Sequence, residues 1–351
     1  MTPQTKKLLW RLLFILASVV FIIIFLKQLG TVSNALETLA HGSWYFLLVV
    51  IGVQAVGIIN RGAFYHSLYD YFGVKDSLKR LIQLSLVSNF FNLAAPSGGL
   101  SGIAVFVSEA QEQGMSRGRA IFMNIFAYFL FYAVFVLVLS FGLFYLLFNH
   151  QLYRYQIISA GFLLGLVVAF IILLLVAIES ATRLRKLLQL MAAAVNYVAK
   201  ILPGNHHPLS ETAVMTLTRE VNECLKNIRK NWRSLWLPAS HVLLIEALDI
   251  LTLYYLFLVF RYPIYPGTLI TVYAIGVLFT LISITPSGVG IVEATMIVVL
   301  TNLAVPVELA AIAVVGYRVA TFWLPFILGY FAFREYQKEK LVQIEDGRQA
   351  R

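Results

Sequence analysis

The stretch NLAAPSGGLSG, residues 92–102, interrupts an otherwise apolar part of the chain with a Pro-Ser-Gly-Gly sequence. Proline removes a backbone donor and clashes with the preceding turn, so a helix that approaches Pro96 must stop there. A second interruption, ITPSGVGIVEA at residues 284–294, has the same Pro-Ser-Gly order, and its Pro286 follows Pro96 by 190 residues. We therefore predict two helix–break–helix segments at corresponding places in two halves of the chain.

The composition places both breaks in a membrane. Of the 351 residues, 60% are hydrophobic and 13% are charged, and the mean hydropathy is +0.82. Soluble domains contain about 45–50% apolar and about 25% charged residues. In lipid, backbone hydrogen bonding restricts spanning elements to helices and closed barrels. The apolar runs are much longer than the alternating segments of about ten residues that a barrel needs. The sequence therefore predicts an all-α polytopic membrane protein.

Windows of about 20 apolar residues mark full transmembrane helices. We expect six of them, at residues 10–28, 43–60, 119–148, 156–178, 236–260 and 308–331. Two further apolar regions, residues 81–111 and 267–303, are the ones that the Pro-Ser-Gly breaks divide.

The positive charges set the expected orientation. With a cytoplasmic N-terminus, 23 of the 27 Lys and Arg residues fall in cytoplasmic segments. Lys27, Arg154 and Arg261 fall outside, and Arg318 lies within a span. Because Lys and Arg concentrate on the cytoplasmic side, we expect a multi-pass protein of the cell (inner or cytoplasmic) membrane with both termini in the cytoplasm. The same distribution explains the net charge of +10 without nucleic acid.

In this topology, each broken region begins and ends on one side of the membrane. The halves are about 12–18 residues long, which favours re-entrant hairpins that meet near the midplane. Two complete crossings would return the chain to the same side, so this alternative stays open. The two units face opposite sides of the membrane. Interrupted segments at corresponding positions of an inverted repeat are typical of transporters and point to their binding site.

The expected organisation is a single membrane domain with a soluble linker. The linker contains a basic amphipathic stretch at residues 183–200, which is suited to anionic lipid headgroups. In order, the segments are a first span (1–42), a first repeat with its hairpin (43–178), a cytoplasmic or interfacial helical linker (179–235), a second repeat with its hairpin (236–333) and a cytoplasmic tail (334–351).

The breaks carry residues suited to binding an anion. After each proline, a half-helix begins with free N–H groups and the positive end of its dipole. Ser97 and Ser287 are good N-cap residues, and glycines leave the backbone open to a ligand. Such a helix end favours phosphate. The alternative is that each break is only a kink that permits tight packing. The candidate glycines are Gly98, Gly99, Gly288 and Gly290.

Charged residues inside the spans are the next candidates. A buried Asp or Arg costs about 2.5–3.5 kcal/mol in a transmembrane helix, so such residues face a cavity or one another. Arg318 and Glu293 belong to the same repeat, and we predict that they form an ion pair, either at the site or as a purely structural link. Glu246 and Asp249 then remain without a basic partner. They are expected to bind a cationic group or carry protons, or to stay protonated without a role.

The remaining polar residues give weaker signals. Arg61 follows the span at residues 43–60 and either contacts a lipid phosphate or snorkels to the cytoplasmic surface. His206 and His207 have no further ligands at metal spacing. We expect neither a metal nor another cofactor.

The second half resembles a known family. Residues 285–331 contain Pro-x-Gly-x-Gly-x-x-Glu, a short helix, and a span with Arg-x-x-Thr, an aromatic residue and Trp-Leu-Pro. This is similar to the lysylphosphatidylglycerol synthase membrane domain, or flippase-like, family. Residues 89–120 are similar to the first hairpin of that family, and Arg61 stands where the family often has arginine. Residues 124–132 depart from it, because many members have a Glu-Arg pair there.

The resemblance implies a module that moves lipids between leaflets, notably aminoacylated phosphatidylglycerol or polyprenyl-linked carriers. A soluble aminoacyl-transferase domain follows in full-length members; we expect this chain to lack it and do not carry lipid synthesis over. The expected function is thus a non-enzymatic lipid flippase whose partners are anionic or aminoacylated phospholipids. A second copy of the chain and a separate lipid-modifying enzyme stay open as partners. The alternative function is a membrane enzyme or accessory subunit acting on lipid phosphate or a polyprenyl-sugar.

Overall fold

The computed structural model describes residues 43–94, 100–148, parts of 158–172, 181–201, 210–283 and 288–349. The regular secondary structure in these ranges is helical, without a strand. The predicted span at residues 10–28, much of the span at 156–178 and both Pro-Ser-Gly breaks, including Ser97, Gly98, Gly99 and Ser287, lie outside them.

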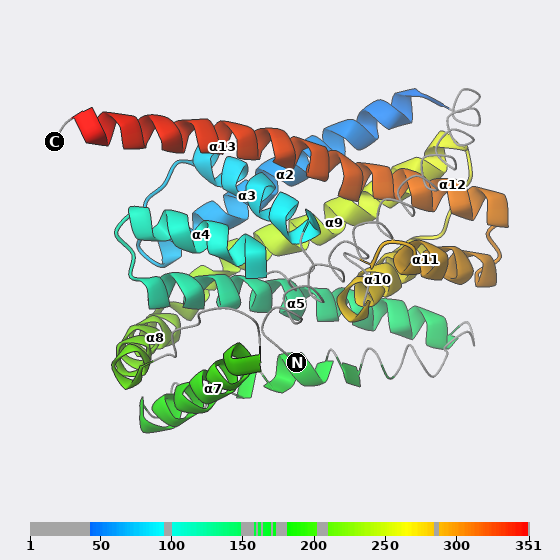
Figure 1. Cartoon of the computed structure of the whole chain (residues 1–351). Helices are drawn as coiled ribbons and strands as arrows, with labels where there is room; N and C mark the ends of the chain where they lie inside the picture. The colour runs from blue at the N-terminus through cyan, green and yellow to red at the C-terminus, as the bar shows by residue number, and fades with distance from the viewer. Residues whose placement is uncertain are drawn as a thin grey trace.

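Four helices of the described part are long and apolar enough to cross a membrane. They contain α2 (Tyr45–Tyr71), α5 (Arg117–Phe148), α9 (Trp236–Val259) and the continuous run of α12 (Val307–Arg318), η3 (Val319–Trp323) and α13 (Leu324–Gln349). They lie side by side in Figure 1. These helices coincide with four of the six predicted spans, and the chain is a multi-pass membrane protein.

Shorter helices flank both breaks, as predicted. The first pair is α3 (Leu78–Ala94) and α4 (Leu100–Glu112), and the second is α10 (Pro266–Ile282) and α11 (Ile291–Asn302). Pro266 starts α10 at a position where its missing N–H is not needed. Gly290 precedes α11 with a φ of 87°, a conformation that favours glycine. In Figure 1 the first pair lies toward the end of the bundle where α13 terminates, and the second toward the opposite end.

Helices of one half of the chain pack on helices of the other half. Helices α2 and α9 pair along their length, α13 packs on α3, and α5 packs on α10. Glycine permits close approach in the last two of these contacts. A Cβ at Gly329 of α13 would lie 2.6 Å from the backbone oxygen of Leu86. A Cβ at Gly142 of α5 would lie 3.1 Å from Cα of Thr271, on α10. Each half therefore covers the short helices of the other.

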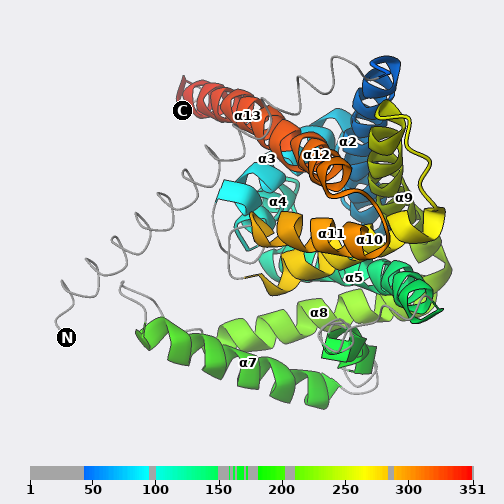
Figure 2. The same ribbon diagram turned by 90° about the vertical axis from the view of Figure 1, so that its right-hand side faces the viewer.

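The linker forms α7 (Ala181–Ile201) and α8 (Glu211–Asn231), which lie beneath the bundle in Figure 2. The amphipathic stretch predicted at residues 183–200 falls within α7 and is helical. The Ser210 hydroxyl accepts a hydrogen bond from the backbone N–H of Ala213 at 3.2 Å and caps α8. A short 3₁₀ turn, η1 (Trp232–Leu235), joins α8 to α9.

One helix extends beyond its predicted span, and this extension matters for the site. The span predicted at residues 43–60 continues as α2 to Tyr71, because no helix breaker stands before Gly73. Arg61 therefore lies inside a helix and not at its end. The predicted tail beyond residue 334 is also helical and continues α13.

Candidate functional site

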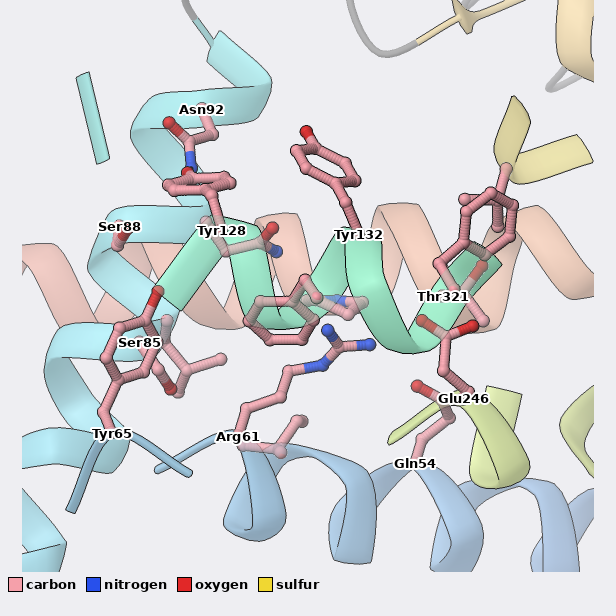
Figure 3. Close-up of a pocket in the computed structure, with 17 residues that line it drawn as sticks. Gln54, Arg61, Tyr65, Ser85, Ser88, Asn92, Tyr128, Tyr132, Glu246 and Thr321 are labelled. Carbon is pink, nitrogen blue, oxygen red and sulfur yellow. The ribbon is translucent and has the colours of Figure 1, made fainter. Parts of the chain in front are cut away.

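A cavity of about 340 Å³ lies inside the bundle, between α2, α3, α5 and α9. Figure 3 shows Arg61 and Glu246 directed into the same space, with Tyr128 and Tyr132 of α5 across it. Neutral hydrogen-bonding side chains surround the two charged residues. They are Gln54, Tyr65, Ser85, Ser88, Asn89, Asn92, Tyr128, Tyr132 and Thr321.

The lining follows helical periodicity on two helices. Helix α3 contributes the polar positions 85, 88, 89 and 92 and the apolar Leu86, and α5 contributes tyrosines at 128 and 132 and phenylalanines at 131 and 135. Residues three and four apart share one face of a helix, so each helix turns a single stripe toward the cavity. The sequence reading missed these residues because they carry no charge. The signal that was available is the run of Ser and Asn at this spacing in an otherwise apolar segment.

Among the described residues that line this cavity, Arg61 is the cationic one. Its Nη2 lies 3.0 Å from Oδ2 of Asp249, and its side chain is 41% exposed although it belongs to a spanning helix. Arg61 lines the cavity and pairs with an acid of α9, which favours a role inside the bundle over the snorkelling alternative. The expectation that Asp249 lacks a basic partner is wrong, since that expectation placed Arg61 at the membrane surface.

A smaller cavity of about 140 Å³ adjoins the first. Arg61, Val277 and Thr321 line both, so the Arg61 side chain stands between them. Asp249, Tyr273, Tyr317 and Arg318 line only the smaller one. Arg61 and Arg318 are far apart in sequence, yet both line the smaller cavity. The Arg61 side chain also lines the larger one.

Glu246 differs from the other intramembrane acids. Its Oε2 accepts a hydrogen bond from the Tyr273 hydroxyl at 2.7 Å, and the residue is 6% exposed. Within the described ranges, Glu246 forms no ion pair with Lys or Arg. Asp249 stands three residues later, one helical turn away, and faces Arg61. Both acids therefore turn toward the cavities, but only Asp249 is charge-paired.

The predicted ion pair between Glu293 and Arg318 is confirmed. Nε of Arg318 donates to Oε1 of Glu293 at 2.7 Å, and both side chains are 9% exposed. Oε2 of Glu293 accepts from the backbone N–H of Gly290 at 2.6 Å. The Arg318 guanidinium also lies 4.6 Å from the centre of the Phe322 ring. This pair fixes the start of α11 to the end of α12, where the π turn η3 begins.

The half-helix N-termini have acceptors from the chain itself. Glu293 accepts from Gly290 at the start of α11, and Oδ1 of Asn92 accepts from the backbone N–H of Gly102 in the first turn of α4, at 2.8 Å. Gly288 has a φ of 71°, which favours glycine. Neither Gly288 nor Gly290 lines the two cavities. Sequence reasoning placed the site at the breaks, of which Ser97, Gly98, Gly99 and Ser287 lie outside the described residues. Among the residues that the structure describes, the larger cavity is lined by helix faces that flank the breaks.

A separate polar cluster ties the first hairpin to α13. Arg80 of α3 donates to both carboxylate oxygens of Glu109, at 2.7 and 3.1 Å, and forms an ion pair with Glu339. Its guanidinium lies 4.7 Å from the centre of the Tyr336 ring. In the adjoining loop, burial raises the pKa of Asp76. This cluster links helix ends and lines neither cavity. Among the described residues, no group of three His, Cys, Asp or Glu side chains is placed to hold a metal ion.

Two comparisons agree with this architecture. The family described as lysylphosphatidylglycerol synthase TM region matches residues 8–329. The chain is also similar to the UPF0104 membrane protein MJ1595 of Methanocaldococcus jannaschii. The two are 24% identical over 344 residues, which cover 93% of this chain and 96% of that protein.

Proposed function

Because the chain belongs to the lysylphosphatidylglycerol synthase transmembrane-region family, we propose that it moves a phospholipid or another lipid phosphate between membrane leaflets. The headgroup would cross through the 340 Å³ cavity while its acyl chains stay in the bilayer. The protein would act as a transporter and not as an enzyme. Aminoacylated phosphatidylglycerol and polyprenyl-linked carriers are the proposed substrate classes.

The observation that carries this proposal is the Arg61 guanidinium inside the cavity. A guanidinium has five N–H donors, and within the described part of the chain one of its nitrogens is hydrogen-bonded, to Asp249. The other donors are available to a ligand in the cavity. Arginine binds phosphate through paired N–H groups, and the surrounding hydroxyl and amide groups suit the oxygens of a headgroup. Asp249 offsets the charge of Arg61 and leaves most of its N–H groups free for a ligand.

The proposal includes an inverted repeat, which would suit transport across the membrane. The helices of the first half begin at residues 45, 78, 100 and 117, and those of the second at 236, 266, 291 and 307. Corresponding contacts also recur, since α13 packs on α3 as α5 packs on α10. With 12 to 17 residues each, the short helices favour re-entrant hairpins. We propose this arrangement in the cell membrane, with both termini cytoplasmic.

The test is lipid exchange in reconstituted liposomes. Vesicles of egg phosphatidylcholine carry a trace of phosphatidylglycerol with a fluorophore on one acyl chain, and dithionite destroys the fluorescence of the outer leaflet. Hydrogen bonds to charged groups contribute about 1.5–3 kcal/mol, so Arg61→Ala should slow exchange by roughly tenfold to a hundredfold. Arg233→Ala is the matched control, because Arg233 is exposed and lies outside both cavities.

A second variant guards against simple loss of folding. Arg61→Ala leaves Asp249 without its ion-pair partner, whereas Arg61→Gln with Asp249→Asn removes both charges and keeps similar shapes. Both variants are expected to be slow, and both are first checked for a monodisperse elution profile. Exchange no faster than in protein-free vesicles for the wild type would reject the flippase proposal. Equal rates for wild type and both variants would reject the site.

A further inference from the structure

We propose that this transport is coupled to protons, and that the acid pair Glu246 and Asp249 takes up one proton when a lipid phosphate binds at Arg61. The inference rests on the proposed function and adds its energy coupling. Two considerations support it: the charged side chains that line the two cavities, and the negative charge that a bound phosphate would add to them.

The charge count is the first step. In the described part of the chain, the charged side chains that line the two cavities are Arg61, Arg318, Glu246 and Asp249. Asp249 already pairs with Arg61, and Arg318 pairs with Glu293. A phosphodiester brings one further negative charge into this space. An uncompensated charge away from water is costly, so binding favours the uptake of a positive charge.

The groups that face the acid pair are the second step. Helix α2 presents Arg61 to both cavities and Tyr65 to the larger one, α10 presents Tyr273, and α12 presents Tyr317 and Arg318. Helix α5 presents Tyr128 and Tyr132 to the larger cavity. Among these groups the tyrosines are neutral and both arginines already have carboxylate partners. No lysine of the described residues lines either cavity. A proton from water is therefore the positive charge that the protein itself can accept.

The acid pair is the place where that proton would reside. Glu246 has the Tyr273 hydroxyl as its hydrogen-bond donor, and Asp249 shares Arg61 with the incoming phosphate. Because the two acids stand one turn apart on α9, a negative charge on one disfavours a negative charge on the other, and a proton on either acid relieves this repulsion. The negative phosphate and the proton then cross together, and the transported combination is electrically neutral.

This neutrality gives a sharp experiment with the wild-type protein. The same labelled phosphatidylglycerol is followed to steady state under either a pH gradient or a membrane potential set by potassium and valinomycin. One-to-one coupling predicts accumulation in the leaflet that faces the alkaline side, with a leaflet ratio of about tenfold per pH unit at full coupling. The potential should leave the distribution unchanged. The opposite pattern, a distribution that follows the potential and ignores the pH gradient, would overturn the coupling alone.

Variants identify the proton-binding groups. In Glu246→Gln with Asp249→Asn, no carboxylate remains at the pair, so lipid should redistribute with the potential and no longer with the pH gradient. Glu308→Gln is the matched control, because Glu308 is an exposed acid at the start of α12, and it should behave as the wild type. A double variant that still responds to the pH gradient would overturn the assignment. Absence of exchange by the wild type under both conditions would reject the proposed function, and the coupling with it.

Discussion

The two hairpin units share a plan but differ in how each is tied to the following long helix. In the second unit, Arg318 of α12 forms a buried ion pair with Glu293 of α11 at 2.7 Å. The residue that stands 190 positions before Arg318 is Tyr128 of α5. The Tyr128 hydroxyl accepts a hydrogen bond from Nδ2 of Asn92, on α3, at 3.2 Å. The first unit therefore has a neutral contact near the place where the second has a charged one.

The two contacts have different consequences: one contributes polar groups to a cavity, and the other holds two helices together. The neutral pair lines the larger cavity, since both Asn92 and Tyr128 belong to its wall. In the charged pair, the Glu293 carboxylate accepts hydrogen bonds from both Arg318 and the backbone N–H of Gly290 at the start of α11. Its charge is therefore used within the protein. The contact that ties the first unit to its long helix thus contributes to the wall of the larger cavity, whereas the contact in the second unit holds two helices together by charge. The comparison predicts three graded effects on stability.

The largest effect is expected from breaking the charged contact. Glu293→Ala leaves the buried Arg318 without its carboxylate, which should lower the free energy of unfolding by about 3–5 kcal/mol. The measurement is thermal unfolding in detergent followed by intrinsic fluorescence. Arg318→Met added to Glu293→Ala should restore part of the loss, because no buried charge then remains unpaired.

The control for this prediction is an exposed ion pair. Lys338 and Glu335 pair at 3.1 Å with both side chains more than 60% exposed, so Glu335→Ala should leave the unfolding temperature nearly unchanged. A loss as small for Glu293→Ala as for Glu335→Ala would show that the second unit is not locked by charge.

An intermediate effect is expected at the contacts of α13 with α3 and of α5 with α10. Added side-chain volume at a close contact costs about 1–3 kcal/mol. Gly329→Val should cost more than Gly142→Val, because its Cβ would lie 2.6 Å from a backbone oxygen, against 3.1 Å from Cα of Thr271. The same unfolding assay measures both. Gly52→Ala is the control, since a Cβ there meets nothing within 4 Å. The reverse order of Gly329 and Gly142 would contradict the packing described here.

The smallest effect is expected at the neutral contact. Tyr128→Phe removes one hydroxyl, and a neutral hydrogen bond contributes about 0.5–1.5 kcal/mol. Tyr330→Phe, at a side chain that is 44% exposed, should change stability less still. If Tyr128→Phe destabilised the protein as much as Glu293→Ala, the two units would be locked alike and the comparison would fail.

Much of the architecture could be predicted because lipid leaves few options. Backbone groups in a bilayer must bond within a helix, so hydropathy and the two prolines sufficed to predict the helices that flank both breaks. The pairing of Glu293 with Arg318 was also predictable, because an intramembrane charge needs a partner and these two stand in one repeat. In contrast, the end of α2 could not be located, since the apolar run weakens after residue 60 while the helix continues to Tyr71.

The sequence by itself determined that this is an all-helical membrane protein with two matched breaks and a buried ion pair. Only the tertiary structure decided where the cavity lies. Arg61 and Asp249 are 188 residues apart and meet because α2 packs along α9. The Ser and Asn side chains of α3 and the tyrosines of α5 become a cavity wall only when both helices face Arg61. A transmembrane helix can be predicted from the apolar residues of one continuous segment. The partner of a charged residue depends on which helices pack together in space.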